Sequence, residues 1–306
     1  MKTDINRRHA LAALGAFGLT NLAGAGCASR LDPPPVRRVR SSAVDGVELA
    51  VHETGNPRGR PVIFIHGFAQ SHESWSAQMQ APALQRELRL ISFDLRGHGD
   101  SGKPLVREAY HDPQRWAQDL RSVMQATGAD KPCIVAWSYG GRVINDYLQA
   151  FGDGDIGSIN YVAATSTAQR FGLGSDYALI GGMLSDDPAT EARATEAFLR
   201  ACFEKQPTEA ELKEMERFNA LTPVAVRKLL AGRPADYDQA LRRLKVPVLV
   251  THGDRDRISA LAMSEYTLGL VPGSKLSLYR GAGHGTFFEE PARFNAELLA
   301  LARTGA

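Results

Sequence analysis

The chain has 306 residues, of which 43% are hydrophobic and 23% are charged, and its formal net charge is +2. This length fits one large α/β domain with a buried core and a pocket. The composition excludes a disordered, collagen-like or disulfide-stapled chain. Removing residues 1–27 would take away three basic residues and one acidic residue and leave a net charge of zero. Such a chain is not expected to bind nucleic acid, because phosphate contacts need an excess of Lys and Arg.

The first 27 residues have the pattern of an export signal. Arg7 and Arg8 precede an apolar stretch over residues 11–25, which is too short to span a membrane and ends in small residues. The arginine pair resembles a bacterial twin-arginine signal, and an ordinary secretory signal is the alternative. We therefore expect an exported, periplasmic protein with no transmembrane span in the mature chain. Cys27 is a candidate for lipid modification, although Gly24 stands where such sites usually have Leu.

Two further cysteines follow the leader. Cys133 lies in an apolar run typical of a buried strand, and Cys202 lies in a helical pattern far downstream. A thiol in a central strand is usually an inert core residue. We expect both to be free thiols.

Short apolar runs alternate with amphipathic stretches from Val39 onward, as in a mostly parallel sheet with helices on both faces. Strands are predicted at Val47–His52, Pro61–His66, Leu88–Phe93, Pro132–Trp137, Ile159–Ala164, Val246–Thr251 and Lys275–Tyr279. Helices are predicted at Pro113–Thr127, Tyr139–Phe151 and Glu289–Arg303.

Residues 166–244, called the cap below, interrupt this alternation. They contain no convincing strand, and their pattern predicts helices at Pro188–Phe203, Thr208–Leu221 and Pro223–Leu230, each with a proline near its start. A helical insertion between two strands of a sheet favours a cap over a site. The core is then made of residues 28–165 and 245–306.

A serine stands directly between a predicted strand and a predicted helix, in Ala136-Trp137-Ser138-Tyr139-Gly140. A sharp turn there would expose Ser138 at the carboxyl edge of the sheet, and the small residues on either side allow strand and helix to pack closely. This pattern predicts a nucleophile. The alternative is a serine N-cap at an ordinary helix start.

A second motif, His66-Gly67-Phe68, ends the strand Pro61–His66. The backbone N–H groups of Phe68 and Tyr139 would both point at the oxygen of a substrate carbonyl and form an oxyanion hole. We interpret His66 as a structural residue, because a histidine at the end of a buried strand is usually hydrogen-bonded there.

A general base and a carboxylate are expected on two later loops. His284 lies in a glycine-rich loop over residues 281–285, which can bring the imidazole over the serine. Asp254 and Asp256 follow the strand Val246–Thr251, where a carboxylate would hold the imidazole tautomer. The order Ser138, Asp256, His284 is the nucleophile–acid–base order of one hydrolase architecture.

These motifs together resemble the α/β-hydrolase superfamily, from about Val39 to the C-terminus. The loop Phe93–Ser101 is similar to the family's D-x-R-G-x-G-x-S loop, which implies structural roles for Asp94, Arg96 and His98. The resemblance implies the α/β-hydrolase fold with a cap between strands six and seven. Within the superfamily, the chain resembles the small capped esterases, lactonases and cofactor-free haloperoxidases.

The spacing in this family favours Asp256 as the acid. The family's acid stands three residues after a glycine and two before an apolar residue, as Asp256 stands between Gly253 and Ile258. Asp254 is then expected to be a turn residue bonded to its own backbone.

Several other activities are excluded by missing motifs. Neither H-x-H-x-D-H nor H-E-x-x-H occurs, so no zinc site is predicted. No P-loop occurs, and no G-x-G-x-x-G opens a helix after a strand, which argues against phosphate transfer and dinucleotide binding. We expect no metal or organic cofactor.

The sequence thus predicts a serine hydrolase that cleaves a small or medium, largely apolar ester or lactone through an acyl-enzyme. Perhydrolysis and carbon–carbon bond hydrolysis are alternatives on the same three residues, and a ligand-binding protein with vestigial turnover is a less favoured one. Apolar residues over 171–184 either line the pocket or pack the cap onto the core. The predicted substrate contacts are Trp137, Phe171, Leu173, Ile258 and Phe287.

Overall fold

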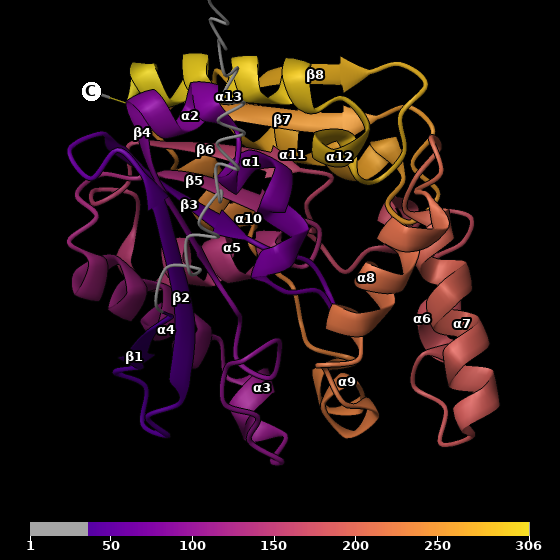
Figure 1. The fold of residues 1–306 in the computed structure, drawn as a ribbon. Coiled ribbons are helices and arrows are strands. Elements are labelled where there is room, and N and C mark those ends of the chain that lie inside the picture. The colour runs from indigo at the N-terminus through magenta and orange to yellow at the C-terminus, as the bar shows by residue number, and fades with distance from the viewer. Residues whose placement is uncertain (1–35, 306) are drawn as a thin grey trace, which may run out of the picture. The chain divides into compact units, whose positions relative to one another are not determined.

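A computed structural model describes residues 36–305 of the chain; the predicted export signal and Cys27 lie outside them. The fold is α/β, with an eight-stranded sheet in the order β1-β2-β4-β3-β5-β6-β7-β8 (Figure 1). Its strands are β1 (Arg37–Arg40), β2 (Glu48–Gly55), β3 (Arg60–Ile65), β4 (Leu88–Phe93), β5 (Cys133–Trp137), β6 (Ser158–Val162), β7 (Val248–Gly253) and β8 (Lys275–Tyr279). Strand β2 is antiparallel to β1 and to β4, and all other neighbours are parallel.

The seven predicted strands correspond to β2 through β8, with ends that shift by up to three residues. Strand β1 was not expected at this position, because its four residues include three arginines and no apolar run. It pairs with β2 at the edge of the sheet. Charged side chains are common on edge strands, where they discourage pairing with other chains.

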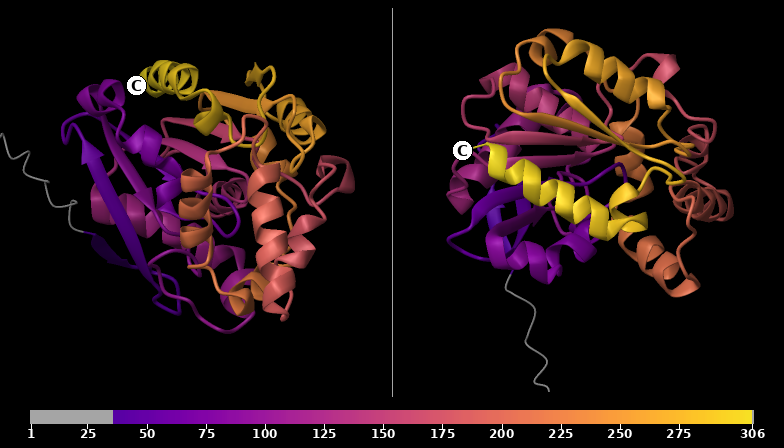
Figure 2. Two further views of the ribbon diagram at one scale, coloured as in Figure 1. Left: turned by 45° about the vertical axis from the view of Figure 1, so that its right-hand side comes forward. Right: turned by 90° about the horizontal axis from the view of Figure 1, so that it is seen from above.

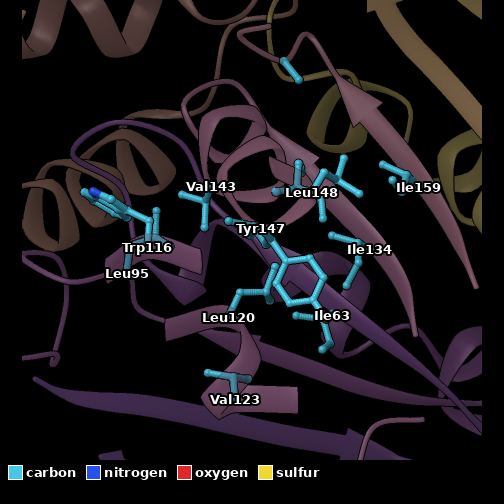
Figure 3. Close-up of a cluster of buried hydrophobic side chains, with 14 of the residues drawn as sticks. Ile63, Leu95, Trp116, Leu120, Val123, Ile134, Val143, Tyr147, Leu148 and Ile159 are labelled. Carbon is cyan, nitrogen blue, oxygen red and sulfur yellow. The ribbon is translucent and has the colours of Figure 1, made fainter. Parts of the chain in front are cut away.

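Helices cover both faces of the sheet, because buried parallel strands send apolar side chains to each side. Ile63 and Ile65 of β3 belong to one core cluster, whereas Val62 and Phe64 belong to another. The first cluster lies under α3 (Glu108–His111), α4 (Pro113–Thr127), α5 (Gly140–Phe151), α10 (Asp238–Arg242) and α11 (Leu261–Leu270). The second lies under α1 (Ser76–Met79), α2 (Pro82–Glu87), α12 (Thr286–Glu289) and α13 (Pro291–Thr304). Figure 3 shows Leu120 of α4 and Tyr147 of α5 meeting the strands in the first cluster.

The cap is helical and lies between β6 and β7, as predicted. Its elements before α10 are η2 (Arg170–Gly172), α6 (Leu179–Gly182), α7 (Pro188–Ala201), α8 (Glu209–Asn219) and α9 (Val224–Leu230). Thr208 starts α8 with a capping box, in which its side chain and that of Glu211 each accept a backbone N–H. Helices α6, α7 and α8 lie together on the side toward which β7 and β8 point, and α9 lies near α3 (Figures 1 and 2).

Cys133 and Cys202 are both buried and free, which confirms the predicted thiols. Within residues 36–305, no helix has the length and apolar character needed to cross a membrane.

Candidate active site

The turn from β5 into α5 is strained at Ser138, whose φ of +53° lies in the left-handed region. A non-glycine residue in this region costs about 1–3 kcal/mol, and such strain is concentrated at functional sites. Two glycines let the turn pack closely, because a Cβ on Gly140 would lie 2.8 Å from the carbonyl oxygen of Ile65, and one on Gly141 would lie 2.8 Å from the Cβ of Ala164. The serine side chain is half-buried at the carboxyl edge of the sheet.

The loop after β3 approaches the same serine. A Cβ on Gly67 would lie 3.2 Å from the Cβ of Ser138, so only glycine allows the two backbones this proximity. The next residues also contain a positive φ, at Ala69. The backbone N–H groups of Phe68 and Tyr139 donate no hydrogen bond to any described residue. Both donors are therefore free for an oxyanion.

Asp256 and His284 are brought together from two loops that are 28 residues apart. The Nδ1 atom of His284 lies 2.7 Å from Oδ2 of Asp256, and each side chain is 1% exposed. The other carboxylate oxygen accepts the N–H groups of Ile258 and Ser259, both at 2.8 Å. These bonds fix the carboxylate so that the histidine carries its proton on Nδ1.

The charge state of Asp256 follows from its surroundings. Burial acts to raise the pKa of Asp256, but electrostatic attraction to the His284 ring and the hydrogen bond from its Nδ1–H outweigh burial, and the pKa lies below its usual value. His252 also contacts this carboxylate, with Nε2 3.5 Å from Oδ2. Burial lowers the pKa of His252, so this imidazole is neutral beside the anion.

The second ring nitrogen of His284, Nε2, is buried and has no hydrogen-bond partner among the described residues, Ser138 included. An unpartnered imidazole nitrogen next to a fixed Nδ1–H is a proton acceptor. Catalytic hydrogen bonds between nucleophile and base are often long before substrate binds. The arrangement can therefore remove a proton from a hydroxyl that comes within reach of Nε2.

Asp254, the other candidate acid, faces elsewhere. Its Oδ1 accepts the N–H of Gly281 at 2.7 Å and lies 3.9 Å from Nε of Arg255. The prediction that Asp254 bonds its own backbone is wrong. Its carboxylate instead joins the turn after β7 to the start of the loop that carries His284. Asp254 thus holds two loops together.

The residues expected to be structural are buried and make hydrogen bonds. The Nδ1 of His66 bonds the carbonyl of Gly67, and its Nε2 accepts the N–H of Leu95. Burial lowers the pKa of His66 to about 4, which keeps the ring neutral. Arg96 donates to both carboxylate oxygens of Asp119. Asp94 accepts the N–H groups of His72 and Asp100, which braces the loop after β4.

One group of side chains in the described part of the chain has the composition of a metal site. Ligand atoms of His52, His72 and Asp94 all lie within 4.8 Å of one another. However, the two imidazole rings are stacked, with centroids 3.5 Å apart and an angle of 9° between their planes. An imidazole binds a metal in the plane of its ring, so two parallel stacked rings do not converge on one ion. This geometry does not support metal binding.

The predicted substrate contacts have different surroundings. Trp137 and Phe287 are 3% and 2% exposed and pack in the core under the site, where the Trp137 indole N–H donates to the carbonyl of His284. Ile258 is buried where the cap meets Ala69. Leu173 is half-buried and pairs with Ser259, whereas Phe171 is 47% exposed. Contact of these residues with substrate stays a prediction.

A comparison with known protein families assigns this chain to a family. Residues 60–291 match the family model described as the alpha/beta hydrolase fold. The chain belongs to the α/β-hydrolase family.

Solved α/β-hydrolase structures include similar esterases. A candidate aryl esterase from Burkholderia cenocepacia is 36% identical with a TM-score of 0.84, over 89% of this chain and 99% of that one. The esterase RhEst1 from Rhodococcus sp. ECU1013 is 33% identical with a TM-score of 0.82, over 89% and 99%. The bifunctional esterase/perhydrolase DCH from Acinetobacter calcoaceticus is 27% identical over 85% of this chain and 98% of its own. Other relatives are non-heme haloperoxidases.

Sequence reasoning missed the support that other residues give to this α/β-hydrolase site. His252, Trp137 and Glu289 all bond the loops that carry Asp256 and His284. Local patterns do not indicate these contacts, because the partners of Trp137 and Glu289 are main-chain groups and the partner of His252 is a carboxylate four residues away. Only the proximity of His252 to Asp256 along the chain was visible.

Proposed function

We propose that this α/β-hydrolase is a serine esterase that acts on a small or medium, largely apolar carboxylic ester or lactone. The supporting observation is the 2.7 Å hydrogen bond between Asp256 and His284 at the same sheet edge as the strained Ser138. Esterases at 33–36% identity over 89% of the chain support the same reaction.

In this mechanism, Ser138 Oγ attacks the carbonyl carbon while His284 Nε2 takes its proton. The N–H groups of Phe68 and Tyr139 bind the oxyanion, a contribution of a few kcal/mol in acyl transfer. His284 then returns the proton to the leaving alcohol, and Asp256 stabilises the imidazolium in between. Water next attacks the acyl-enzyme carbonyl and gives a proton to His284, which passes it to Ser138 Oγ as the carboxylic acid is released.

The direct test is labelling with a fluorophosphonate probe, which should modify Ser138. Ser138→Ala should fold normally and lose esterase activity by several orders of magnitude, because removal of the nucleophile disables the whole catalytic unit. A screen of aryl esters of increasing acyl length, with lactones and amides, would define the substrate class. Undiminished ester turnover by Ser138→Ala would overturn the proposal.

Perhydrolysis is a second candidate, favoured by the similarity to the bifunctional esterase/perhydrolase. Hydrogen peroxide would replace water in the attack on the acyl-enzyme and give a peracid. Peracid formation from acetate and hydrogen peroxide, measured beside ester hydrolysis, separates the two activities. No peracid above the rate of Ser138→Ala would leave hydrolysis alone.

We also propose that residues 1–27 direct export through the twin-arginine route, which rests on Arg7, Arg8 and the short apolar stretch after them. Replacing both arginines with lysine keeps the charge but should leave the precursor in the cytoplasm. Continued export of that variant would indicate an ordinary secretory signal.

A further inference from the structure

The loop that carries His284 is held by the cap as well as by the core. The N–H of Gly285 donates to the carbonyl of Cys202 at 3.1 Å, and Cys202 directly follows helix α7 of the cap. From the core, the Trp137 indole N–H donates to the carbonyl of His284 at 3.0 Å. His284 is thus bonded on one side to the strand of the nucleophile and flanked on the other by cap contacts.

Glu289 extends this cap contact with a single carboxylate. Its Oε1 accepts the N–H of Gly283 at 2.7 Å, next to His284. Its Oε2 accepts the N–H groups of Lys205 at 2.8 Å and Glu204 at 3.2 Å, which belong to the cap. The Glu289 side chain therefore joins the backbone of the histidine loop to the backbone of the cap.

The two segments also touch directly. A Cβ on Gly283 would lie 2.9 Å from the nitrogen of Glu204 and 3.0 Å from the carbonyl oxygen of Cys202. A Cβ on Gly285 would lie 2.3 Å from Cε1 of Phe203. Both glycines that flank His284 are therefore in contact with residues 202–204, and a displacement of this part of the cap would displace the histidine loop.

We propose that Glu289 is a positioning residue that couples the cap to His284, so that the position of residues 202–205 sets the alignment of the imidazole. This inference rests on the proposed esterase function, in which His284 is the base. It gives the cap a role in the chemical step in addition to any role in substrate binding. Misplacing a catalytic group by about 1 Å can cost as much as 100-fold in rate.

Glu289→Gln tests the coupling, because the amide group cannot accept on both sides of the contact. We expect kcat on a short aryl ester to fall by between about 10- and 100-fold, with KM changed by less than about twofold. The low-field proton NMR signal of the His284 Nδ1–H should shift or broaden, because the bond to Asp256 loosens. Glu290→Gln is the matched control. Among the described residues, the Glu290 carboxylate pairs with the exposed side chains of Lys205 at 3.3 Å and Arg293 at 4.0 Å, so its replacement should leave kcat and the NMR signal unchanged.

Gly283→Ala is a second variant, which separates the same segments by adding a methyl group, and it should show the same fall in kcat. Hydrogen exchange of the wild-type protein needs no variant: residues 202–205 and 283–289 should become exposed together as denaturant is added. Wild-type kcat and an unmoved NMR signal in Glu289→Gln, or separate opening of the two segments, would overturn the coupling. Failure of the wild-type protein to react with a fluorophosphonate at Ser138 would instead overturn the esterase function.

Discussion

The carboxyl edge of the sheet and the cap are held by different kinds of contact. At the sheet edge, backbone groups position the candidate catalytic residues: the Ser138 carbonyl accepts the N–H groups of Gly141 and Thr165, and two N–H groups hold Asp256. In the cap, where the described residues 166–244 contain no strand, buried arginine side chains make the contacts between segments. Arg227 bonds Glu191 and Asn219, and Arg233 pairs with Asp146 of the core.

This difference indicates what each region controls. Backbone register fixes the sheet edge to within a fraction of an ångström, as nucleophilic catalysis requires. A few side-chain pairs can hold the cap in place while leaving its sequence free to vary. We infer that changes at the sheet edge affect chemistry and that most changes in the cap affect stability or substrate preference.

The largest effect is expected at the acid of the sheet edge. Asp256→Asn should keep the fold and lower turnover by ~10⁴-fold, because His284 would then adopt the wrong tautomer. Asp254→Asn, two residues away, should lower turnover by at most about tenfold, because its carboxylate only joins two loops. Steady-state kinetics on one aryl ester measures both. The reverse ranking would make Asp254 the acid.

The next largest effect is expected at the buried ion pair between Arg233 and Asp146, which anchors the cap to the core. Arg233→Met leaves Asp146 buried without its partner, and loss of one member of a buried ion pair costs about 3–5 kcal/mol of stability. Burial already raises the pKa of Asp146 to about 6. Denaturant unfolding should show the loss, and limited proteolysis should cut first within residues 166–244. The control Arg200→Met removes solvent-exposed ion pairs of the cap and should leave the free energy of unfolding nearly unchanged. Equal losses of stability in the two variants would contradict the role of Arg233 as the anchor of the cap.

Acid should weaken the core before it weakens the cap, because the cap contains no histidine. Burial lowers the pKa of His66 to about 4 and that of His98 to about 3, from an ordinary value of 6.5. A depressed pKa gives stability that is fully present above pH 6.5 and is lost as the pH falls toward 4. A difference of one in pKa corresponds to about 1.4 kcal/mol, so protonation of His66 alone would lower the free energy of unfolding by about 3 kcal/mol over this pH range.

Denaturant unfolding measured between pH 7 and pH 4 tests this difference. The free energy of unfolding should fall across the range, and His98→Gln should flatten the curve, since it removes one titrating ring. A curve that does not change over this range would contradict the neutral state of these histidines.

The smallest effect on activity is expected from the apolar residues at the start of the cap. Ile180 is half-buried against the cluster that contains Ile258, whereas Met183 is fully buried in it. Ile180→Ala should shift the preferred acyl length by a few-fold and leave stability nearly unchanged. Met183→Ala should cost about 2–5 kcal/mol without changing preference. Aryl esters of graded acyl length and thermal unfolding measure the two effects, and a uniform fall on every ester after Ile180→Ala would indicate packing instead.

The sequence alone determined strands β2 to β8, helices α4, α5 and α13, and the helical cap. The hydrophobic period and the residues at each end of an element are local signals, so the predicted bounds of β4, β8 and α4 agree with the structure at both ends. The motifs around Ser138, Asp256 and His284 were visible for the same reason. Each lies on the turn or loop that follows a strand, and both the strand's hydrophobic period and the composition of the loop are local properties of the sequence.

The tertiary structure alone decided how the loops support one another. It showed that Asp254 bonds Gly281, that Trp137 donates to the His284 carbonyl, and that Glu289 holds Gly283 to the cap. These partners are 6 to 147 residues apart, and in each contact one of the two groups is a main-chain atom that every residue type carries. A backbone N–H or carbonyl leaves no signature in the sequence, so only the folded chain reveals which side chain it bonds.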